Sequence, residues 1–426
     1  MYDFKGTELL VLCLCVLGQK KPRKENGMKN LYKVLVGILL CMLLASCSKK
    51  DTSVDQQDDT QAQEEVSTET EEEVVDTEKY ITNEEVNLRE LVVQYMYDMA
   101  NVKWTSTQLM DYSDDCGSSS LVYQPGQTYL GQPYSAGHNG FEVFEDSLDA
   151  DGNYINEDIS WYGPGNACSS SVKHAWKQVS PNVDYTTAVT MMPYYENTGI
   201  VPVGDIDWSL YDGMNTINSL IALTPEQDLW EAYAQVLPGD AFIRYLNTGG
   251  HALMVTLEPV VTRNADGTIN PFQSYVYLTD QNSLLRRGRE YPSSWAVDVK
   301  YNFLQMRKDG YLPVTIPELQ EGKTERPWFE LTDAPTAQAL ESESTLTGTV
   351  TSNYWLVSVK AEVRKDSVDG EVAASGVVHP YTKSFALADL TEELALDQLP
   401  AGEYCLVIDG EVGLAQETLL ELNFTK

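Results

Sequence analysis

The sequence predicts an α+β domain, in which helices pack on an antiparallel sheet, followed by a small all-β sandwich. Three observations support this fold class. Apolar residues recur at helical spacing in residues 83–104, 168–179 and 225–236. Residues 241–282 contain short β-type runs separated by Gly-containing turns, which is typical of antiparallel strands. From residue 344 onward, short alternating runs and Asp-Gly or Pro-Ala-Gly turns replace the helical periodicity.

The first segment is an apolar leader. Residues 28–47 read MKNLYKVLVGILLCMLLASC, with a basic start, a short apolar run and small residues before Cys47. The apolar run is shorter than a typical membrane-spanning helix requires. The pattern resembles a bacterial lipoprotein signal, which implies that synthesis starts at Met28. The same resemblance implies that Cys47 is lipidated and anchors the protein to the bacterial cell membrane, outside the cytoplasm.

An acidic tether follows the leader. It is dense in Asp, Glu, Gln, Ser and Thr, and such a segment cannot bury enough apolar area to fold. The whole chain has 64 acidic against 29 basic residues, a net charge of −35, which argues against nucleic acid as a partner. The domain organisation that we expect is a leader, a disordered tether, a main domain, a linker rich in Pro and Glu, and the sandwich, over residues 1–47, 48–80, 81–312, 313–343 and 344–426.

Cys168 stands at the start of a predicted helix. The stretch 163–176 reads GPGNACSSSVKHAW, so glycines and a proline end a loop and three serines offer caps before the apolar stripe of the helix. A helix N-terminus favours a thiolate over a thiol. The Asp-rich stretch before this loop lacks the ligand spacing of a calcium loop, and no zinc spacing of Cys and His is present. We therefore expect no metal and no cofactor.

Two further polar residues follow Cys168 in an order that suits nucleophilic catalysis. His251 opens the strand 251–257 after a Gly-Gly turn, and Asp280 lies at the end of the next strand, 274–282. A cysteine nucleophile needs a base, and the base needs a third polar group to orient its ring. Side chains alternate along a strand, so Asp280 and Asn282 share a face, while Gln281 replaces them if the strand is offset by one residue. We favour Asp280 as the third member.

Three motifs in this order resemble the NlpC-like family of cell-wall cysteine peptidases, papain-like enzymes related to the CHAP amidases. They are YLGQPY at 129–134, ACSSSV at 167–172, and LPGD at 237–240 followed by GHALMV at 250–255. The resemblance covers about residues 87–282. It implies a papain-like catalytic domain with Cys168 as nucleophile, His251 as general base and Asp280 as the orienting residue. The residues that it places around the substrate are Tyr134 and Ser169, and the backbone N–H of Cys168 would help to stabilise an oxyanion.

The resemblance implies a cell-surface hydrolase that cleaves an amide bond in peptidoglycan stem peptides or cross-links. Two positions depart from the family pattern. Ala167 stands where the family has an Asp that recognises a substrate amine, and Ser170 replaces a Gly. The alternative is therefore a weakened NlpC-like module that binds cell-wall peptides or a partner without hydrolysis. The C-terminal sandwich resembles β accessory domains of clostridial cell-wall hydrolases, which implies attachment or spacing.

Overall fold

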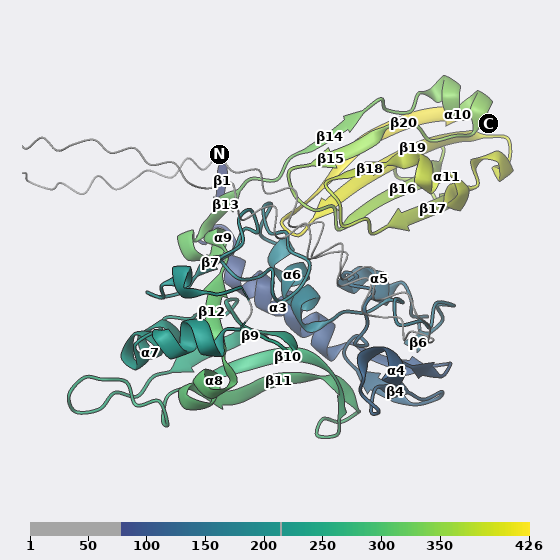
Figure 1. Ribbon diagram of the computed structural model, residues 1–426. Helices are drawn as coiled ribbons and strands as arrows, with labels where there is room; N and C mark the ends of the chain where they lie inside the picture. The colour runs from purple at the N-terminus through teal and green to yellow at the C-terminus, as the bar shows by residue number, and fades with distance from the viewer. Residues whose placement is uncertain (1–77, 214) are drawn as a thin grey trace, which may run out of the picture. The chain divides into compact units, whose positions relative to one another are not determined.

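A computed structural model describes residues 78–213 and 215–426 (Figure 1). The predicted leader, Cys47 and almost all of the predicted tether lie outside the described residues. Tyr80, the last residue assigned to the tether, already belongs to strand β1 (Tyr80–Thr82). Within the described ranges, no helix combines the length and the apolar character that a membrane crossing requires.

The fold is mixed α/β, and an antiparallel six-stranded sheet forms the centre of its first part. The strand order is β11-β10-β9-β8-β12-β7, with every neighbouring pair antiparallel. The strands are β7 (Val201–Pro202), β8 (Ala241–Leu246), β9 (Gly249–Val260), β10 (Tyr275–Arg286), β11 (Ser293–Asn302) and β12 (Leu312–Thr315). The predicted strands at 241–245, 251–257 and 274–282 correspond to β8, β9 and β10, whereas β11 carries no prediction.

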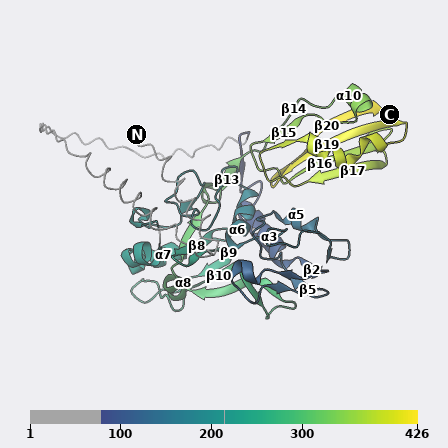
Figure 2. The same ribbon diagram turned by 45° about the vertical axis from the view of Figure 1, so that its right-hand side comes forward.

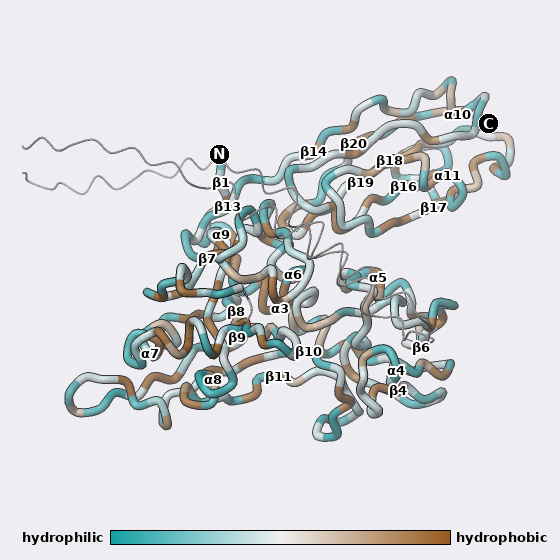
Figure 3. Tube along the Cα trace, viewed as in Figure 1, coloured by the Kyte–Doolittle hydropathy of each residue, from teal (hydrophilic) through white to brown (hydrophobic). Residues whose placement is uncertain are grey.

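Helices α3 and α6 pack against each other and against β9, and the two views of the ribbon agree on this arrangement (Figures 1 and 2). Hydrophobic residues, brown in Figure 3, recur along α3 and α7. The helix α3 begins after Asn87, whose side chain accepts from the Glu90 N–H, so it starts later than the predicted residue 83. The helical elements of this part include α3 (Leu88–Asn101), α6 (Cys168–Lys177), η1 (Trp208–Leu210), the π-turn η2 (Ile217–Ile221), α7 (Glu226–Ala234) and α8 (Phe303–Asp309).

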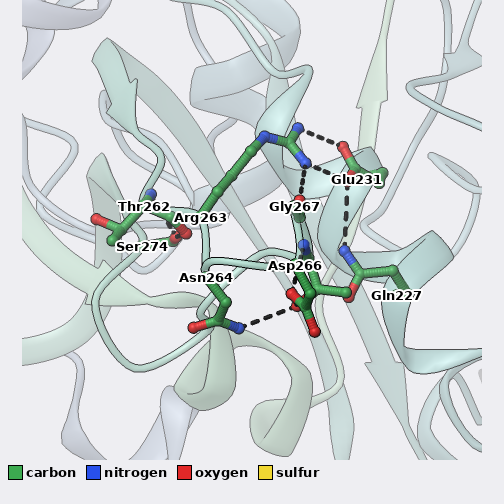
Figure 4. A network of polar contacts seen from close by, with 9 residues as sticks. Gln227, Glu231, Thr262, Arg263, Asn264, Asp266, Gly267 and Ser274 are labelled. Carbon is green, nitrogen blue, oxygen red and sulfur yellow. Dashed lines mark hydrogen bonds and ion pairs between the residues drawn. The ribbon is translucent and has the colours of Figure 1, made fainter.

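A bidentate ion pair connects the hairpin between β9 and β10 to helix α7. Figure 4 shows the Arg263 guanidinium donating to both carboxylate oxygens of Glu231, at 2.6 and 2.8 Å, and to the Gly267 carbonyl at 3.0 Å. Both charged side chains are substantially exposed, so this contact fixes the hairpin geometry more than it stabilises the fold.

An aromatic cluster forms a second, smaller core within this part. Trp104 packs against Tyr123, Tyr129, Phe144 and Tyr154, with ring centroids 5.2–5.8 Å apart. Small elements surround it: β2 (Lys103–Ser106), β3 (Met110–Asp111), α4 (Ser113–Cys116), β4 (Val122–Tyr123), β5 (Thr128–Leu130), α5 (Phe141–Glu145) and β6 (Asn153–Tyr154). These aromatic residues therefore hold a structural unit together.

The prediction that residues 313–343 form a linker is wrong, because most of these residues belong to helices and strands. Its elements are part of β12, α9 (Pro317–Glu321), β13 (Lys323–Glu325), β14 (Phe329–Thr332) and α10 (Ala337–Glu343). Repeated Pro and Glu suggested an unfolded segment. However, Val314, Ile316 and Leu319 are buried in the main core, and β13 pairs with β1, so the first part continues to about residue 325.

The C-terminal part has its own hydrophobic core and two antiparallel sheets. One sheet has the order β14-β15-β18 and the other β17-β16-β19-β20. Residues of both sheets contribute to the same core, which is the arrangement of a sandwich. The elements after α10 are β15 (Thr349–Ser352), β16 (Ser358–Lys365), β17 (Val372–Val378), β18 (Ser384–Ala386), η3 (Leu387–Leu390), α11 (Thr391–Leu394), η4 (Leu396–Gln398), β19 (Glu403–Val412) and β20 (Ala415–Thr425).

Candidate active site

Cys168 is the first residue of α6, and the helix start leaves backbone donors beside its sulfur. The N-cap is Ala167, which has no side-chain acceptor for the N–H groups of the first turn. Ser170 instead accepts from the Ala167 N–H with its Oγ at 2.8 Å. The backbone N–H groups of Ser169 and Ala252 lower the pKa of the Cys168 thiol. The nucleophile candidate is thus surrounded by donors that favour an anion.

His251 connects Cys168 to Asp280. It lies near the start of β9, opposite Arg244 in the ladder with β8, and α6 packs against β9. Its Nε2 donates to Asp280 Oδ2 at 3.1 Å. The other ring nitrogen, Nδ1, is left for Cys168, which lies close enough for His251 to lower the pKa of its thiol. The structure therefore brings Cys168, His251 and Asp280 together.

Asp280 is almost fully buried on β10, with a side chain that is 1% exposed. Its Oδ2 also accepts from Asn282 Nδ2 at 3.0 Å. Its Oδ1 has no hydrogen-bond partner, although Arg286 Nη1 lies 3.6 Å from it. Arg286 and Asp280 form an ion pair at this distance, which is too long for a hydrogen bond.

Gln281 points to the opposite face of β10 from Asp280 and Asn282, as the two-residue period of a strand requires. Its Nε2 donates to the Gln132 carbonyl at 2.8 Å, and its side chain is completely buried. Of the three alternatives for the third member, Asp280 contacts His251, Asn282 contacts Asp280, and Gln281 holds the loop before Tyr134.

The charges of the site support one another. Burial disfavours a charged imidazole, but the Cys168 thiolate and the Asp280 carboxylate outweigh it and raise the pKa of His251 to about 9. Burial likewise opposes the Cys168 thiolate, and His251 reverses this effect, so the pKa of the thiol is lowered. The pKa of Asp280 is lowered against burial by its bond to His251, with help from Arg286 and Asn282. Each of these charges therefore stabilises the other, which favours a thiolate–imidazolium pair.

Tyr134 and Ser169, the two predicted substrate-binding residues, both lie beside the thiol. Burial and the Cys168 charge raise the pKa of Tyr134, so its hydroxyl stays neutral. Its ring lies 5.8 Å, centroid to centroid, from that of Trp161. Ser169 is buried and contributes its backbone: its N–H faces the sulfur, and its carbonyl accepts from the Tyr185 hydroxyl at 2.9 Å.

Sequence reasoning missed three side chains around the site, Trp161, Tyr185 and Arg286. Tyr185 lies on an irregular segment after α6, where neither period nor motif marks it. Trp161 lies directly before the loop that leads to Cys168, so its place in the chain offered a signal. Arg286 lies beyond the predicted end of its strand, and its contact depends on how that strand bends.

The other described cysteines and His174 have different surroundings from those of Cys168 and His251. Cys116 and Cys405 are free thiols, and burial raises the pKa of each. Burial lowers the pKa of His174 to about 3, and its Nε2 is bonded to the His138 carbonyl at 2.8 Å, which gives it a structural role. Across the described ranges, no group of three or more His, Cys, Asp or Glu side chains is arranged to hold a metal ion.

The chain was compared with known proteins by sequence. No family model matches it, and no curated protein matches it.

Proposed function

We propose that this protein is a papain-like, NlpC-type cysteine hydrolase that cleaves an amide bond in peptidoglycan stem peptides or cross-links at the bacterial cell surface. The observation that carries the proposal is the grouping of Cys168, His251 and Asp280, in which His251 donates to the carboxylate and lowers the pKa of the thiol. The nucleophile comes from a helix start, and the base and its partner come from adjacent antiparallel strands. This division of the three residues between helix and sheet is the one that the sequence pattern predicts.

The reaction follows from the charges of the site. The Cys168 thiolate attacks the amide carbonyl carbon, and backbone N–H groups at the start of α6 stabilise the oxyanion. The imidazolium of His251 gives its proton to the leaving amine, the C–N bond breaks, and a thioester remains on Cys168. Neutral His251 then takes a proton from water, whose oxygen attacks the thioester. The products are a free amine and a carboxylic acid, and the thiolate–imidazolium pair is restored.

The substrate group beside the nucleophile is uncharged in this proposal. Ala167 presents a methyl group where the family carries a carboxylate for a substrate amine. Tyr134 and Trp161 form an aromatic wall on this side, and the Tyr134 hydroxyl remains neutral. A free N-terminal amine is therefore a poor ligand here, whereas an apolar or sugar-linked acyl group can lie against the rings.

A second candidate function is a module that binds cell-wall peptides or a partner without hydrolysis. Two observations favour it. Ala167 removes a substrate-recognition carboxylate, and the Cys168 residue is only 7% exposed. A carbonyl carbon must reach the sulfur for hydrolysis, so limited access would leave a binding surface and little catalysis.

Digestion of purified peptidoglycan decides between the two. Wild-type protein, Cys168→Ala and the matched thiol control Cys116→Ser are incubated with peptidoglycan, and soluble products are identified by mass spectrometry. The proposal predicts fragments from the wild type and from Cys116→Ser, each with one new amine and one new carboxyl group, and none from Cys168→Ala. Co-sedimentation of the wild type with intact peptidoglycan, without any fragments, would instead support the binding module.

A further inference from the structure

The buried carboxylate of Asp280 has one oxygen that no hydrogen bond satisfies. Oδ2 accepts from His251 and Asn282, whereas Oδ1 accepts from no group in the described structure. A buried unpaired carboxylate oxygen is costly, because it loses its hydration without gaining a protein donor. The guanidinium of Arg286, 3.6 Å from Oδ1, is the nearest compensation, and its side chain is 37% exposed.

The other groups that face Asp280 do not donate to its Oδ1, so Arg286 is the group that compensates the charge of this oxygen. His251 approaches from β9, Asn282 from β10, Tyr301 from β11, and Tyr311 from the segment before β12. Burial and the Asp280 charge raise the pKa of both tyrosines, so they stay neutral. Among the described residues, His251 and Arg286 are the cations that form ion pairs with Asp280.

The contact depends on an irregular strand. Six residues of straight strand would separate Asp280 from Arg286 by about 20 Å, which is beyond the reach of an arginine side chain. The pairing of β10 with β11 is irregular between Gln281 and Arg286, where Gln281 pairs with Trp295 and Arg286 with Ser293. Between these two pairs, four residues of β10 lie opposite one residue of β11, so the strand bends and brings the guanidinium back toward Asp280.

We propose that Arg286 is a positioning residue of the site, whose guanidinium fixes the Asp280 carboxylate so that Oδ2 faces His251. This inference rests on the proposed function of the three residues. Arg286 acts on the nucleophile through two intermediaries: it orients Asp280, Asp280 supports the His251 imidazolium, and the imidazolium supports the thiolate.

Loss of the Arg286 guanidinium shifts the protonation of Asp280 in a direction that can be worked out. Without Arg286, burial acts on Asp280 with one less opposing cation, so the carboxyl group binds a proton at a higher pH than in the wild type. A protonated Asp280 no longer stabilises the imidazolium. The thiolate–imidazolium pair of Cys168 and His251 is then lost earlier as the pH falls, and kcat falls with it.

Three variants test this inference: Arg286→Ala, Arg286→Lys and the matched control Arg287→Ala on the same hairpin. Arg287 is exposed and forms no ion pair among the described residues. Two readouts are taken between pH 4 and 9, the rate at which iodoacetamide alkylates Cys168 and the kcat and KM of peptidoglycan hydrolysis. Circular dichroism and thermal unfolding confirm that each variant is folded.

The inference predicts that Arg286→Ala moves the acid limb of both profiles upward by about half a pH unit to one unit and lowers kcat with little change in KM. Arg286→Lys restores part of the shift, because it retains the charge, and Arg287→Ala matches the wild type. Superimposable acid limbs for Arg286→Ala and wild type would overturn the inference, as would a raised KM with unchanged kcat, which would mark a substrate contact. Failure of the proposed function is distinguishable, because the wild type itself would then show ordinary thiol reactivity and no hydrolysis.

Discussion

The imidazole of His251 donates from Nε2 to Oδ2 of Asp280 at 3.1 Å, across two neighbouring antiparallel strands. This bond leaves the other ring nitrogen for Cys168 and fixes the tautomer of the neutral ring. Since Asp280 is buried, the bond is shielded from water and from salt. The relationship makes the third member of the site testable by substitution.

The Asp280→Asn variant tests the role of the carboxylate charge in catalysis separately from its role in folding. The amide keeps the volume of the side chain but loses the charge that supports the imidazolium. We expect kcat to fall between about 10²- and 10⁴-fold, as for a triad that loses its carboxylate. Asn282→Ala removes a supporting donor only, so its loss of kcat is expected to be about tenfold or less. Steady-state kinetics on peptidoglycan fragments measures both.

Gln281→Leu is the companion variant on the opposite face of β10. It removes a buried hydrogen bond to the Gln132 carbonyl, so we expect a loss of about 1–3 kcal/mol in the free energy of unfolding and no shift of the pH–rate profile. If Gln281→Leu changed the profile and Asp280→Asn did not, the assignment of the third member would be wrong.

The raised pKa of His251 is expected to set the alkaline limit of activity. In the proposed mechanism the imidazolium protonates the leaving amine, and it persists in the folded protein until the pH approaches about 9. An ordinary histidine loses its proton near pH 6.5. We therefore expect kcat to stay high between pH 7 and 8 and to fall as the pH rises through about 9. A fall centred near pH 6.5 in stopped-assay kinetics would show that His251 does not carry this shift.

Trp161 is expected to contribute to substrate binding. Its ring is half-buried and contacts the rings of Tyr134 and Tyr112. Trp161→Ala should raise KM by about two- to tenfold with a smaller effect on kcat, because an aromatic contact is worth about 0.5–1.5 kcal/mol beyond its area. Trp161→Phe should recover most of the loss. The control is Tyr162→Ala, because Tyr162 is 69% exposed. An equal rise in KM in this variant would contradict a specific contribution of Trp161 to substrate binding.

The motif residue Asp240 has a structural role that the fold explains. Its carboxylate accepts from Arg89 on α3 at 2.9 Å, from Thr315 on β12 at 2.5 Å and from the Leu237 N–H at 2.8 Å. Asp240 is 2% exposed, so removal of Arg89 leaves a buried carboxylate without its cation. We expect Arg89→Ala to lower the free energy of unfolding by about 3–5 kcal/mol in urea titrations.

The matched control for this prediction is Arg263→Ala, which breaks the exposed ion pair shown in Figure 4. Its effect on unfolding should be small, because water and salt screen that pair. Equal losses for the two variants would contradict the anchoring role of Asp240.

Local chemistry explains which parts of the fold and site could be predicted. The glycines and Pro164 before Cys168 end a loop, and the serines after it start a helix, so the helix start required no tertiary information. The alternation along β10 placed Asp280 and Asn282 on one face and Gln281 on the other. In each case the signal lies within a few residues of the feature.

Other features depend on distant residues and escaped prediction. Val314 and Leu319 are buried by helices far away in the sequence, so their Pro- and Glu-rich surroundings read as a linker. Arg286 reaches Asp280 only because β10 bends against β11. The burial of Tyr129 in an aromatic cluster depends on rings from several short strands. No periodicity marks such contacts, because packing decides them.

The central claim is that His251 activates Cys168 as a nucleophile, and the pH dependence of cysteine alkylation tests it most directly. The folded protein is treated with iodoacetamide between pH 4 and 10, and modification of each cysteine is followed by peptide mass spectrometry in wild type and His251→Ala. We predict that Cys168 reacts well below pH 7 in the wild type, that Cys116 and Cys405 react only at alkaline pH, and that His251→Ala removes the difference. Slow alkylation of Cys168 below pH 8, unchanged in His251→Ala, would contradict the account.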